Sequence, residues 1–395
     1  MGVMLVVMAV VIWLGIYFAF ENFWNNLFNL STNLMLIMFV HIWLSASFSF
    51  WATEQKVEYK YAKLVVLTLL MAILSPSLSA YLVLKCKDKV TARIAGGLIV
   101  QTLLYGWLFF YHLKNGKSFF SKVYWKYALC FNLPLIPHYL STIILNSSDR
   151  IMIANMVDNR SAGIYSLSYS VSMVLTIFNS SLLSTIEPWL YQKLKSNDLR
   201  KLPKVAYFSL SLIAGINIAL IAFAPEIIAF FAPEEYYDAV WIIPPVVMSV
   251  YFMFSYSYFA AFEFYFKKTG YIAVATMVGA VLNIVLNYIF IRFYGYYAAG
   301  YTTLICYIIY AVAHYVFMSR ICKEFLNGNK VYNLKILLLI TFVFMSLGFA
   351  FLATYVNMIA RYSLIGIMVL IVLFKHKLII SSIKNFIKIK NIKEG

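Results

Sequence analysis

Residues 63–84 read KLVVLTLLMAILSPSLSAYLVL, and after Lys63 this run contains no charged side chain. An α-helix rises about 1.5 Å per residue, so the run is long enough to cross the roughly 30 Å of bilayer hydrocarbon. The strands of membrane β-barrels are about ten residues long with alternating hydropathy, which this continuous run does not match. We therefore predict a transmembrane α-helix here.

The composition extends this prediction to most of the chain. Of the 395 residues, 63% are hydrophobic and 12% are charged, and the mean hydropathy is +0.82. In ordinary soluble domains, about 45–50% of the residues are hydrophobic and about 25% are charged. A soluble globule could not form its charged surface from this composition, and the same values exclude a disordered chain. The sequence predicts an all-α, polytopic integral membrane protein.

About twelve segments have the length and hydropathy of a transmembrane helix. They lie near residues 1–20, 31–51, 63–84, 92–113, 129–157, 161–192, 203–224, 238–266, 270–292, 297–320, 333–355 and 360–380. The fifth segment contains Pro134 and Pro137, each of which lacks a backbone N–H. We expect these prolines to bend or loosen that helix near one end.

The basic residues predict the orientation of these helices. The 32 Lys and Arg residues exceed the 15 Asp and Glu residues, for a net charge of +17. Alternate connections, together with the C-terminal tail, hold 24 of the basic residues, and the opposite connections hold 7. The positive-inside rule therefore places both termini in the cytoplasm. We attribute the positive charge to contact with anionic membrane lipid and predict no nucleic-acid partner.

The sequence carries no motif for catalysis or cofactor binding. It contains no nucleotide-binding glycine loop, acyl-transfer motif or zinc-binding motif, and its four cysteines occur singly. The five histidines are scattered over different segments; each could relay a proton or bond a neighbouring helix, and packing is the favoured interpretation. We predict no catalytic residue, no metal and no cofactor, and therefore a protein that is not an enzyme.

The fifth segment has one polar face. At about 100° per residue, Asp149 lies about 20° around the helix from His138. Ser141, Thr142, Asn146 and Ser148 fall near the same direction. Lipid cannot satisfy such a face, so it must line a water-filled cavity or meet another polar helix.

Two interpretations of Asp149 stay open. The carboxylate lies inside the hydrocarbon zone, where it is either a charged group of a cavity or one member of an interhelical salt bridge. Arg150 points about 100° away, so we expect it to extend outward or to meet a partner on a neighbouring helix.

Two further segments raise the same choice between function and packing. In the sixth, a polar set could line the same cavity or close helix contacts; it consists of Tyr165, Ser168, Ser172, Thr176 and Asn179. The eighth carries an aromatic stripe that could stack on sugar rings, although packing is favoured; it consists of Tyr251, Ser255, Tyr258, Phe262 and Tyr265. Glu263 lies near Lys267, and we expect a surface ion pair there.

Three stretches together resemble the polysaccharide-export flippases (Wzx-like transporters of O-antigen and related repeat units). These flippases are relatives of the multidrug and toxin extruders and of the lipid II flippases. The first stretch is PLIPH at 134–138 with SDRIMI at 148–153 and AGIYSLSYS at 162–170. The second is LNIVLNYIFI at 282–291 with YGYYAAG at 294–300 and TTL at 302–304. The third is VEYKYAK at 57–63. The similarity in spacing runs over nearly the whole chain.

The resemblance implies a fold of two six-helix lobes around a central cavity, as in the multidrug extruders and lipid II flippases. It divides the chain into a partial N-terminal lobe of four helices (1–126), a C-terminal lobe of six helices (127–320), and two extra helices with a basic cytoplasmic tail (321–395). The first lobe is therefore expected to be incomplete and to lack the first two helices of the family pattern.

The resemblance also implies a function: translocation of undecaprenyl-diphosphate-linked oligosaccharide repeat units across the bacterial inner (cytoplasmic) membrane, for assembly of O-antigen or capsule. The implied partners are the lipid-linked oligosaccharide, membrane lipid, a polysaccharide polymerase and a chain-length regulator. The residues that we predict to line the substrate cavity are His138, Ser141, Thr142, Ser148, Asp149, Arg150, Ser168, Ser172 and Asn179.

Two other functions remain as alternatives. A cation-coupled drug exporter of the same superfamily would need an acidic residue within the membrane in the first lobe, whereas Glu21, Glu54, Glu58 and Asp88 are all expected in loops. A membrane glycan polymerase or transferase would need a large outer loop rich in Arg, His and acidic residues. No outer loop exceeds about fifteen residues in this placement of the helices.

The predicted orientation can be tested with reporter fusions. A reporter that is active only in the cytoplasm should be active when fused at Lys201 or Lys330 and inactive at Glu235, because the positive-inside rule places the first two positions inside. Measuring reporter activity at the three positions checks this, and the reverse pattern would overturn the orientation.

Overall fold

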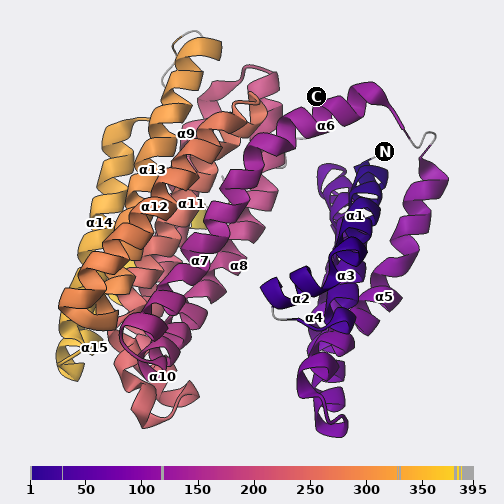
Figure 1. The fold of residues 1–395 in the computed structure, drawn as a ribbon. Helices are drawn as coiled ribbons and strands as arrows, with labels where there is room; N and C mark the ends of the chain where they lie inside the picture. Colours follow the sequence, from indigo (N-terminus) through magenta and orange to yellow (C-terminus); the bar gives the residue numbers. More distant parts are fainter. Residues whose placement is uncertain are drawn as a thin grey trace. The chain divides into compact units, whose positions relative to one another are not determined.

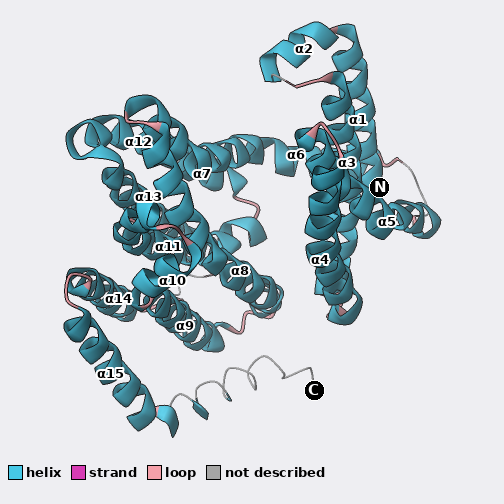
Figure 2. Ribbon diagram, turned by 90° about the horizontal axis from the view of Figure 1, so that it is seen from below, coloured by secondary structure: helices cyan, strands magenta, loops and turns pink. Residues whose placement is uncertain are grey.

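The computed structural model describes residues 2–28, 30–116, 120–326, 328, 331–377, 380, 381 and 384. Within this part of the chain every regular element is a helix (Figure 2), which confirms the predicted all-α class. Ten helical stretches of the described residues are long and apolar enough to cross a membrane. The protein is therefore a multi-pass membrane protein.

One of the ten stretches, Thr269–Phe325, consists of two helices. Gly295, at a φ of +67°, ends α12 (Thr269–Tyr294), and α13 (Ala298–Phe325) returns alongside it. This φ is in the region that glycine adopts without steric cost. A further apolar helix, α15 (Met358–Phe374), has 17 residues. Counted in this way, the described helices agree with the prediction of about twelve.

The chain folds as two compact units, Met1–Asn132 and Leu133–Gly395. The corresponding boundary expected from the sequence lies between residues 126 and 127. The first unit contains α1 (Gly2–Ala19), α2 (Glu21–Phe28), α3 (Thr32–Val57), α4 (Tyr61–Lys85), α5 (Lys89–Asn115) and α6 (Lys122–Asn132) (Figure 1).

In the first unit, α5 packs against both α3 and α4, and α1 packs against α3. Two polar contacts join α3 to α5: Gln101 Nε2 donates to Ser45 Oγ at 2.8 Å, and His112 Nε2 lies 3.0 Å from the Ser47 carbonyl oxygen. The helix α3 continues to Val57, six residues beyond the predicted end. Glu54 therefore lies on the last turns of a helix, and its expected position in a loop was wrong.

The second unit contains the remaining long helices. They are α7 (Ile136–Met156), α8 (Asn159–Lys195), α9 (Leu202–Ala222), α10 (Ala224–Phe231), α11 (Ile243–Tyr265), α12, α13, α14 (Leu334–Thr354) and α15. Short 3₁₀ turns occur at Leu133–Leu135 (η1), Leu199–Lys201 (η2), Glu234–Trp241 (η3) and Gly295–Tyr297 (η4). The helices α7, α8, α11, α12 and α13 run side by side (Figure 1).

The predicted weak point of the fifth segment is confirmed. The helix α6 ends at Asn132, the 3₁₀ turn η1 contains Pro134, and α7 begins at Ile136 with Pro137 in its first turn. Each proline removes one backbone donor, and its ring clashes with the preceding turn of a continuous helix. A proline costs little at the start of a helix, where the backbone N–H groups have no helical partner.

The centre of the second unit is α11, which packs against α8, α9, α13 and α14. Most of its residues are buried, including the aromatic stripe members Tyr251, Tyr258 and Phe262. The Tyr251 ring lies 4.4 Å from that of Phe344 on α14, and its hydroxyl lies 3.0 Å from Thr341 Oγ1. The stripe is therefore a packing surface, which supports the favoured interpretation over sugar stacking.

The last two helices, α14 and α15, pack against other helices of the second unit. The helix α14 lies against α9, and Arg361 of α15 forms an ion pair with Glu226 of α10. The hydroxyl of Tyr362 donates to the same Glu226 oxygen at 2.7 Å. Arg361 is only 5% exposed, whereas the Glu226 side chain is 37% exposed, so this ion pair joins α15 to α10 with one buried and one partly exposed partner.

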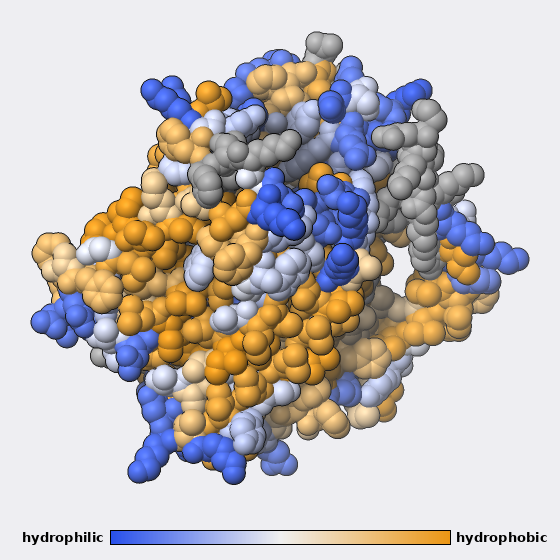
Figure 3. Space-filling model, turned by 90° about the vertical axis from the view of Figure 1, so that its right-hand side faces the viewer, coloured by the Kyte–Doolittle hydropathy of each residue, from blue (hydrophilic) through white to orange (hydrophobic). Residues whose placement is uncertain are grey.

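Large apolar side chains cover the outside of the helices. Leu103, Phe293 and Phe230 are each at least 75% exposed, and many other apolar side chains are similarly exposed. On the face shown in Figure 3, hydrophobic residues form a broad band and hydrophilic residues gather toward its edges. A water-soluble protein rarely exposes such continuous apolar area, so lipid is the solvent for these side chains.

The close contact between α12 and α13 gives a test of the packing. A Cβ atom at Gly279 would lie 2.1 Å from the Tyr310 ring, whose hydroxyl donates to the Thr276 carbonyl oxygen at 2.6 Å. We expect Gly279→Ala to displace this ring and to lower the free energy of unfolding by about 1–3 kcal/mol. Thermal unfolding of the purified protein in detergent measures this change.

The matched control is Gly215→Ala on α9, where a Cβ atom meets nothing within 4 Å. Because alanine favours a helix over glycine by up to about 1 kcal/mol, this variant should be as stable as the natural protein or more stable. An equal change in the free energy of unfolding in the two variants would contradict the close contact at Gly279.

Candidate functional site

Asp149 is held by neutral hydrogen-bond donors from three other helices. Its side chain is buried, at 1% exposure. The carboxylate accepts hydrogen bonds from the Tyr165 hydroxyl on α8 at 2.5 Å, from Asn287 Nδ2 on α12 at 2.5 Å and from Thr303 Oγ1 on α13 at 2.7 Å. Among the described residues, no Lys or Arg forms an ion pair with it. The salt-bridge interpretation of Asp149 was therefore wrong.

Three further residues surround this carboxylate. Ser148 Oγ donates to Asn283 Oδ1 at 2.9 Å, and Asn283 lies one helical turn before Asn287 on α12. Thr302 of α13 donates to Asn287 Oδ1. We call the seven residues the buried polar cluster: Ser148, Asp149, Tyr165, Asn283, Asn287, Thr302 and Thr303.

The local sequence explains why these residues meet. Residues four apart lie on one helical face, so Asn283 and Asn287 both point toward α7, which packs along α12. The turn at Gly295 then returns the chain, and Thr302 and Thr303 follow early in α13. The sequence stretches 148–153, 162–170, 282–291 and 302–304 each contribute to the cluster.

Arg150 contacts a partner on α8, which is the second of the two positions expected for it, a contact with a neighbouring helix. Its guanidinium carbon lies 4.7 Å from the centre of the Tyr169 ring, and its Nη2 donates to the Asn146 carbonyl oxygen at 2.7 Å. The side-chain oxygen of Asn146 accepts from the hydroxyls of Tyr169 at 3.0 Å and Tyr307 at 3.3 Å. Arg150 therefore lies beside Asp149 in the chain but in a different set of contacts.

The other predicted residues of α7 lie toward its beginning. His138 Nδ1 is 3.1 Å from Thr276 Oγ1 on α12, an interhelical contact of the favoured packing type. Thr142 Oγ1 donates to the His138 carbonyl oxygen of its own helix at 2.9 Å, and Ser141 is buried at 6% exposure. The polar face of α7 thus meets α12 over much of its length.

The predicted residues of α8 make packing contacts outside the cluster. Ser168 Oγ donates to the Ala239 carbonyl oxygen of η3 at 2.9 Å, and Asn179 Nδ2 donates to the Val250 carbonyl oxygen of α11 at 2.9 Å. Ser172 Oγ donates to the Ser168 carbonyl oxygen at 2.8 Å. The structure thus brings Ser148 and Asp149 together in the cluster and separates Ser168, Ser172 and Asn179 from it.

Four cluster residues were not predicted as site residues from the sequence: Asn283, Asn287, Thr302 and Thr303. The available signal was a pair of asparagines four residues apart in an otherwise apolar segment, since two amides on one face of a membrane helix need partners. The position of Glu263 was also mispredicted from the sequence. This side chain is fully buried and lies 2.8 Å from His314 Nδ1, so the expected surface ion pair was wrong.

The buried polar cluster is suited to binding polar or cationic groups. It combines one carboxylate with amide and hydroxyl oxygens, which are hard ligands for small cations and acceptors for sugar hydroxyls. The described residues contain no group of three or more His, Cys, Asp or Glu side chains that could hold a metal ion. The cluster therefore has the chemistry of a hydrogen-bonding site with a single acidic group.

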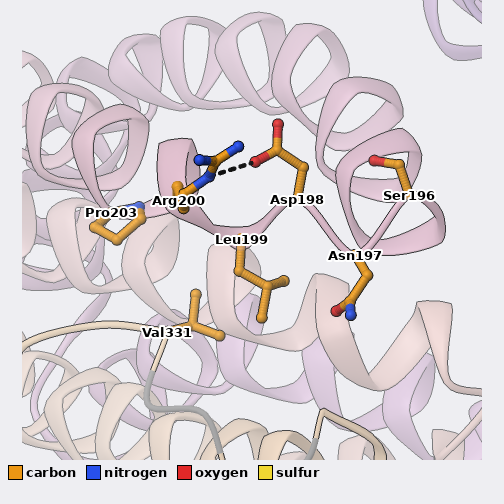
Figure 4. Close-up of a pocket in the computed structure, with 7 residues that line it drawn as sticks. All are labelled: Ser196, Asn197, Asp198, Leu199, Arg200, Pro203 and Val331. Atoms are coloured by element: carbon orange, nitrogen blue, oxygen red, sulfur yellow. Dashed lines mark ion pairs between the residues drawn. The ribbon is translucent and has the colours of Figure 1, made fainter.

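A pocket of about 650 Å³ lies elsewhere, at the connection between α8 and α9. It is lined by Ser196, Asn197, Asp198, Leu199, Arg200, Pro203 and Val331 (Figure 4). The ion pair within it joins Arg200 Nε to Asp198 Oδ1 at 3.6 Å, and the Arg200 side chain is 95% exposed. Exposed pairs of this kind contribute about 0–1 kcal/mol. This open surface pocket shares no residue with the buried polar cluster.

The arrangement of helices is similar to that of two solved membrane proteins. The structure is similar to an outward-facing multidrug resistance MATE family transporter of the MOP superfamily, with a TM-score of 0.59 and 12% identity over 75% of this chain and 70% of that one. It is also similar to the lipid II flippase MurJ in an inward closed conformation, with a TM-score of 0.57 and 16% identity over 94% of this chain and 82% of that one. At these identities the similarities establish the fold.

Sequence comparison adds a family match. The model of the polysaccharide biosynthesis protein family matches residues 1–194, which include Asp149 and Tyr165. The chain is 28% identical to Lsg locus protein 1 of Haemophilus influenzae over 217 residues, which are 53% of this chain and 47% of that protein. It is 22% identical to a second membrane protein of that organism over 49% of this chain and 50% of the relative. The chain thus spans about half the length of the curated relatives that it matches.

Removing one donor of the cluster tests the geometry. Thr303→Val keeps the shape of the side chain and leaves the buried Asp149 carboxylate with one partner fewer. We expect the free energy of unfolding to fall by about 1–3 kcal/mol. Thermal unfolding in detergent measures the loss.

Thr185→Val is the matched control, because Thr185 lies outside the cluster, is only partly buried and bonds the Ser181 carbonyl oxygen of its own helix. It should change stability by less than about 0.5 kcal/mol. If both threonine variants lose the same stability, Thr303 is not a significant donor to Asp149.

Proposed function

We propose that this protein moves a lipid-linked oligosaccharide from the inner to the outer leaflet of the bacterial cytoplasmic membrane. The proposed substrate is an undecaprenyl-diphosphate-linked repeat unit for O-antigen or capsule assembly. The match to a polysaccharide biosynthesis family and the fold shared with a lipid II flippase support this choice. Both termini lie in the cytoplasm in this proposal, in accordance with the distribution of basic residues.

The physical problem for such a transporter is the head group. A glycan with a diphosphate cannot cross about 30 Å of hydrocarbon unaided, since each buried polar group without a partner costs several kcal/mol. The prenyl tail has no such difficulty and can remain in lipid. The protein must therefore offer hydrogen-bonding groups within the membrane.

The observation that carries the proposal is the buried polar cluster around Asp149. Burying a carboxylate that has no cationic partner is expensive, and several other helices supply donors to this one. Intramembrane ionisable groups that are held in this way usually serve transport. If α7 and α12 separate, the same carboxylate, amides and hydroxyls become available to the hydroxyl groups of a sugar.

The charges divide the proposed roles within the site. Asp149 repels a diphosphate and accepts hydrogen bonds from sugar hydroxyls, so we assign it to the glycan. Arg150 is the cation of the predicted set, and its bidentate donor geometry suits phosphate oxygens. His138, Ser141, Thr142 and Ser148 extend the polar wall along α7. Ser168, Ser172 and Asn179 would join it only when α8 moves away from α11 and η3.

This role is transport and requires no catalytic residue. A polysaccharide polymerase and a chain-length regulator are the proposed partners that act on the translocated unit. The multidrug transporter fold is equally similar, but the first unit shows no acidic group in the middle of a described helix, since Glu54 lies at the end of α3 and Glu21 at the start of α2. We therefore favour the lipid-linked glycan.

Asp149→Asn tests the proposed site in cells whose surface polysaccharide depends on this protein. The amide keeps the size of the side chain and removes its charge, and the Asn287 amide can rotate to accept a hydrogen bond from it. We expect near-normal amounts of folded protein and surface polysaccharide lowered by about tenfold, equivalent to about 1.4 kcal/mol in transport. Immunoblots of membranes and gel analysis of the polysaccharide measure the two quantities.

Glu234→Gln is the matched control, since Glu234 is an exposed acidic residue of η3 outside the cluster. It should leave both quantities unchanged. Normal polysaccharide at normal protein amounts in Asp149→Asn would remove Asp149 from the site. A loss of protein in proportion to the loss of polysaccharide would show a purely structural role.

A further inference from the structure

A second buried ionisable centre lies in the same unit as the Asp149 cluster. Glu263 of α11 and His314 of α13 are both completely buried, and Glu263 Oε1 lies 2.8 Å from His314 Nδ1. The two helices that they join have extensive mutual contact at the core of the unit. His314 follows Thr303 by eleven residues on α13, which is about 16 Å along a helix. The pair is therefore separate from the buried polar cluster.

The immediate surroundings of the pair are aromatic. The Tyr256 ring of α11 stacks on the His314 ring at 5.4 Å, and the rings of Tyr310 and Phe317 meet its edges at 6.2 and 6.3 Å. Tyr310 uses its hydroxyl on the Thr276 carbonyl oxygen of α12. These three aromatic residues thus add no charge next to the pair.

The ionisable groups on the neighbouring elements have their own contacts. His138 of α7 contacts Thr276, and Tyr191 of α8 packs its ring on Tyr265. After α11, the Lys268 ammonium bonds Glu324 at 2.9 Å. Among the described residues, His314 is the basic group that pairs with Glu263.

The pair leaves two polar atoms without a partner. Glu263 Oε2 and His314 Nε2 are buried and have no hydrogen bond within the described part of the chain. If the pair shares one proton, it is neutral overall, as carboxylate with imidazolium or as carboxylic acid with imidazole. In either form at least one buried donor or acceptor stays unsatisfied, which costs free energy. A change of conformation that admits water would satisfy these atoms and let the proton exchange.

We propose that Glu263 and His314 form a proton-binding site that exchanges one proton with water when α11 and α13 separate. The ligand is a proton, because the site is completely enclosed and its two remaining polar atoms belong to an acid and a base. Glu263 lies two residues before the end of α11, so its path to the aqueous phase is short. The inference goes beyond the proposed glycan transport and is tested without any glycan.

The test is nuclear magnetic resonance of the whole protein in lipid nanodiscs with ¹⁵N-labelled histidine. His314→Gln identifies the His314 signals by their loss. In the natural protein these signals should change between pH 5 and pH 9 as one proton binds. In Glu263→Gln they should remain those of neutral imidazole throughout, because a buried imidazolium without a carboxylate partner is disfavoured.

Two further variants keep the result interpretable. The exchanged pair, Glu263→His with His314→Glu, restores one carboxylate and one imidazole, so the histidine at 263 should again change with pH. His112→Gln on α5 of the first unit should leave the His314 signals unaltered. His314 signals that do not change with pH in the natural protein, or that change in the same way in Glu263→Gln, would overturn the proposal.

Discussion

A carboxylate inside a membrane must find its hydrogen-bond donors within the protein, and Asp149 takes them from α8, α12 and α13. This requirement links four helices of the second unit. It fixes the rotation of α7, because Ser148 and Asp149 must meet Asn283 and Asn287. It also fixes the turn at Gly295, since Thr302 and Thr303 must return to the same level of the membrane.

The apolar packing around this centre follows a different rule. Between lipid-facing helices there is little hydrophobic driving force, so close contacts and shape complementarity hold the bundle together. The aromatic residues of α11 and the close approach at Gly279 supply such contacts. The Glu263–His314 pair is an exception within this core, since it places an acid and a base where aliphatic side chains would pack at lower cost.

These features together fit a transporter better than a static membrane anchor. A structural bundle can be held together by apolar contacts alone, whereas a transporter needs polar groups that can exchange protein partners for substrate or water. In our proposals, the cluster around Asp149 and the Glu263–His314 pair both have this property. Their separation along α13 would allow the proposed glycan contact and the proposed proton exchange to occur at different places in one helical unit.

The sequence by itself determined the helical class, the approximate helix positions and the break at Pro134 and Pro137, because hydropathy, length and missing backbone donors act locally. It also selected Asp149 through the polar face of one helix. Only the tertiary structure decided what that face meets. The partners Asn287 and Thr303 are 138 and 154 residues away in the chain, and no helical period connects them to Asp149. For the same reason Glu263 was expected beside a nearby lysine, whereas packing of α11 on α13 placed it against His314 in the core.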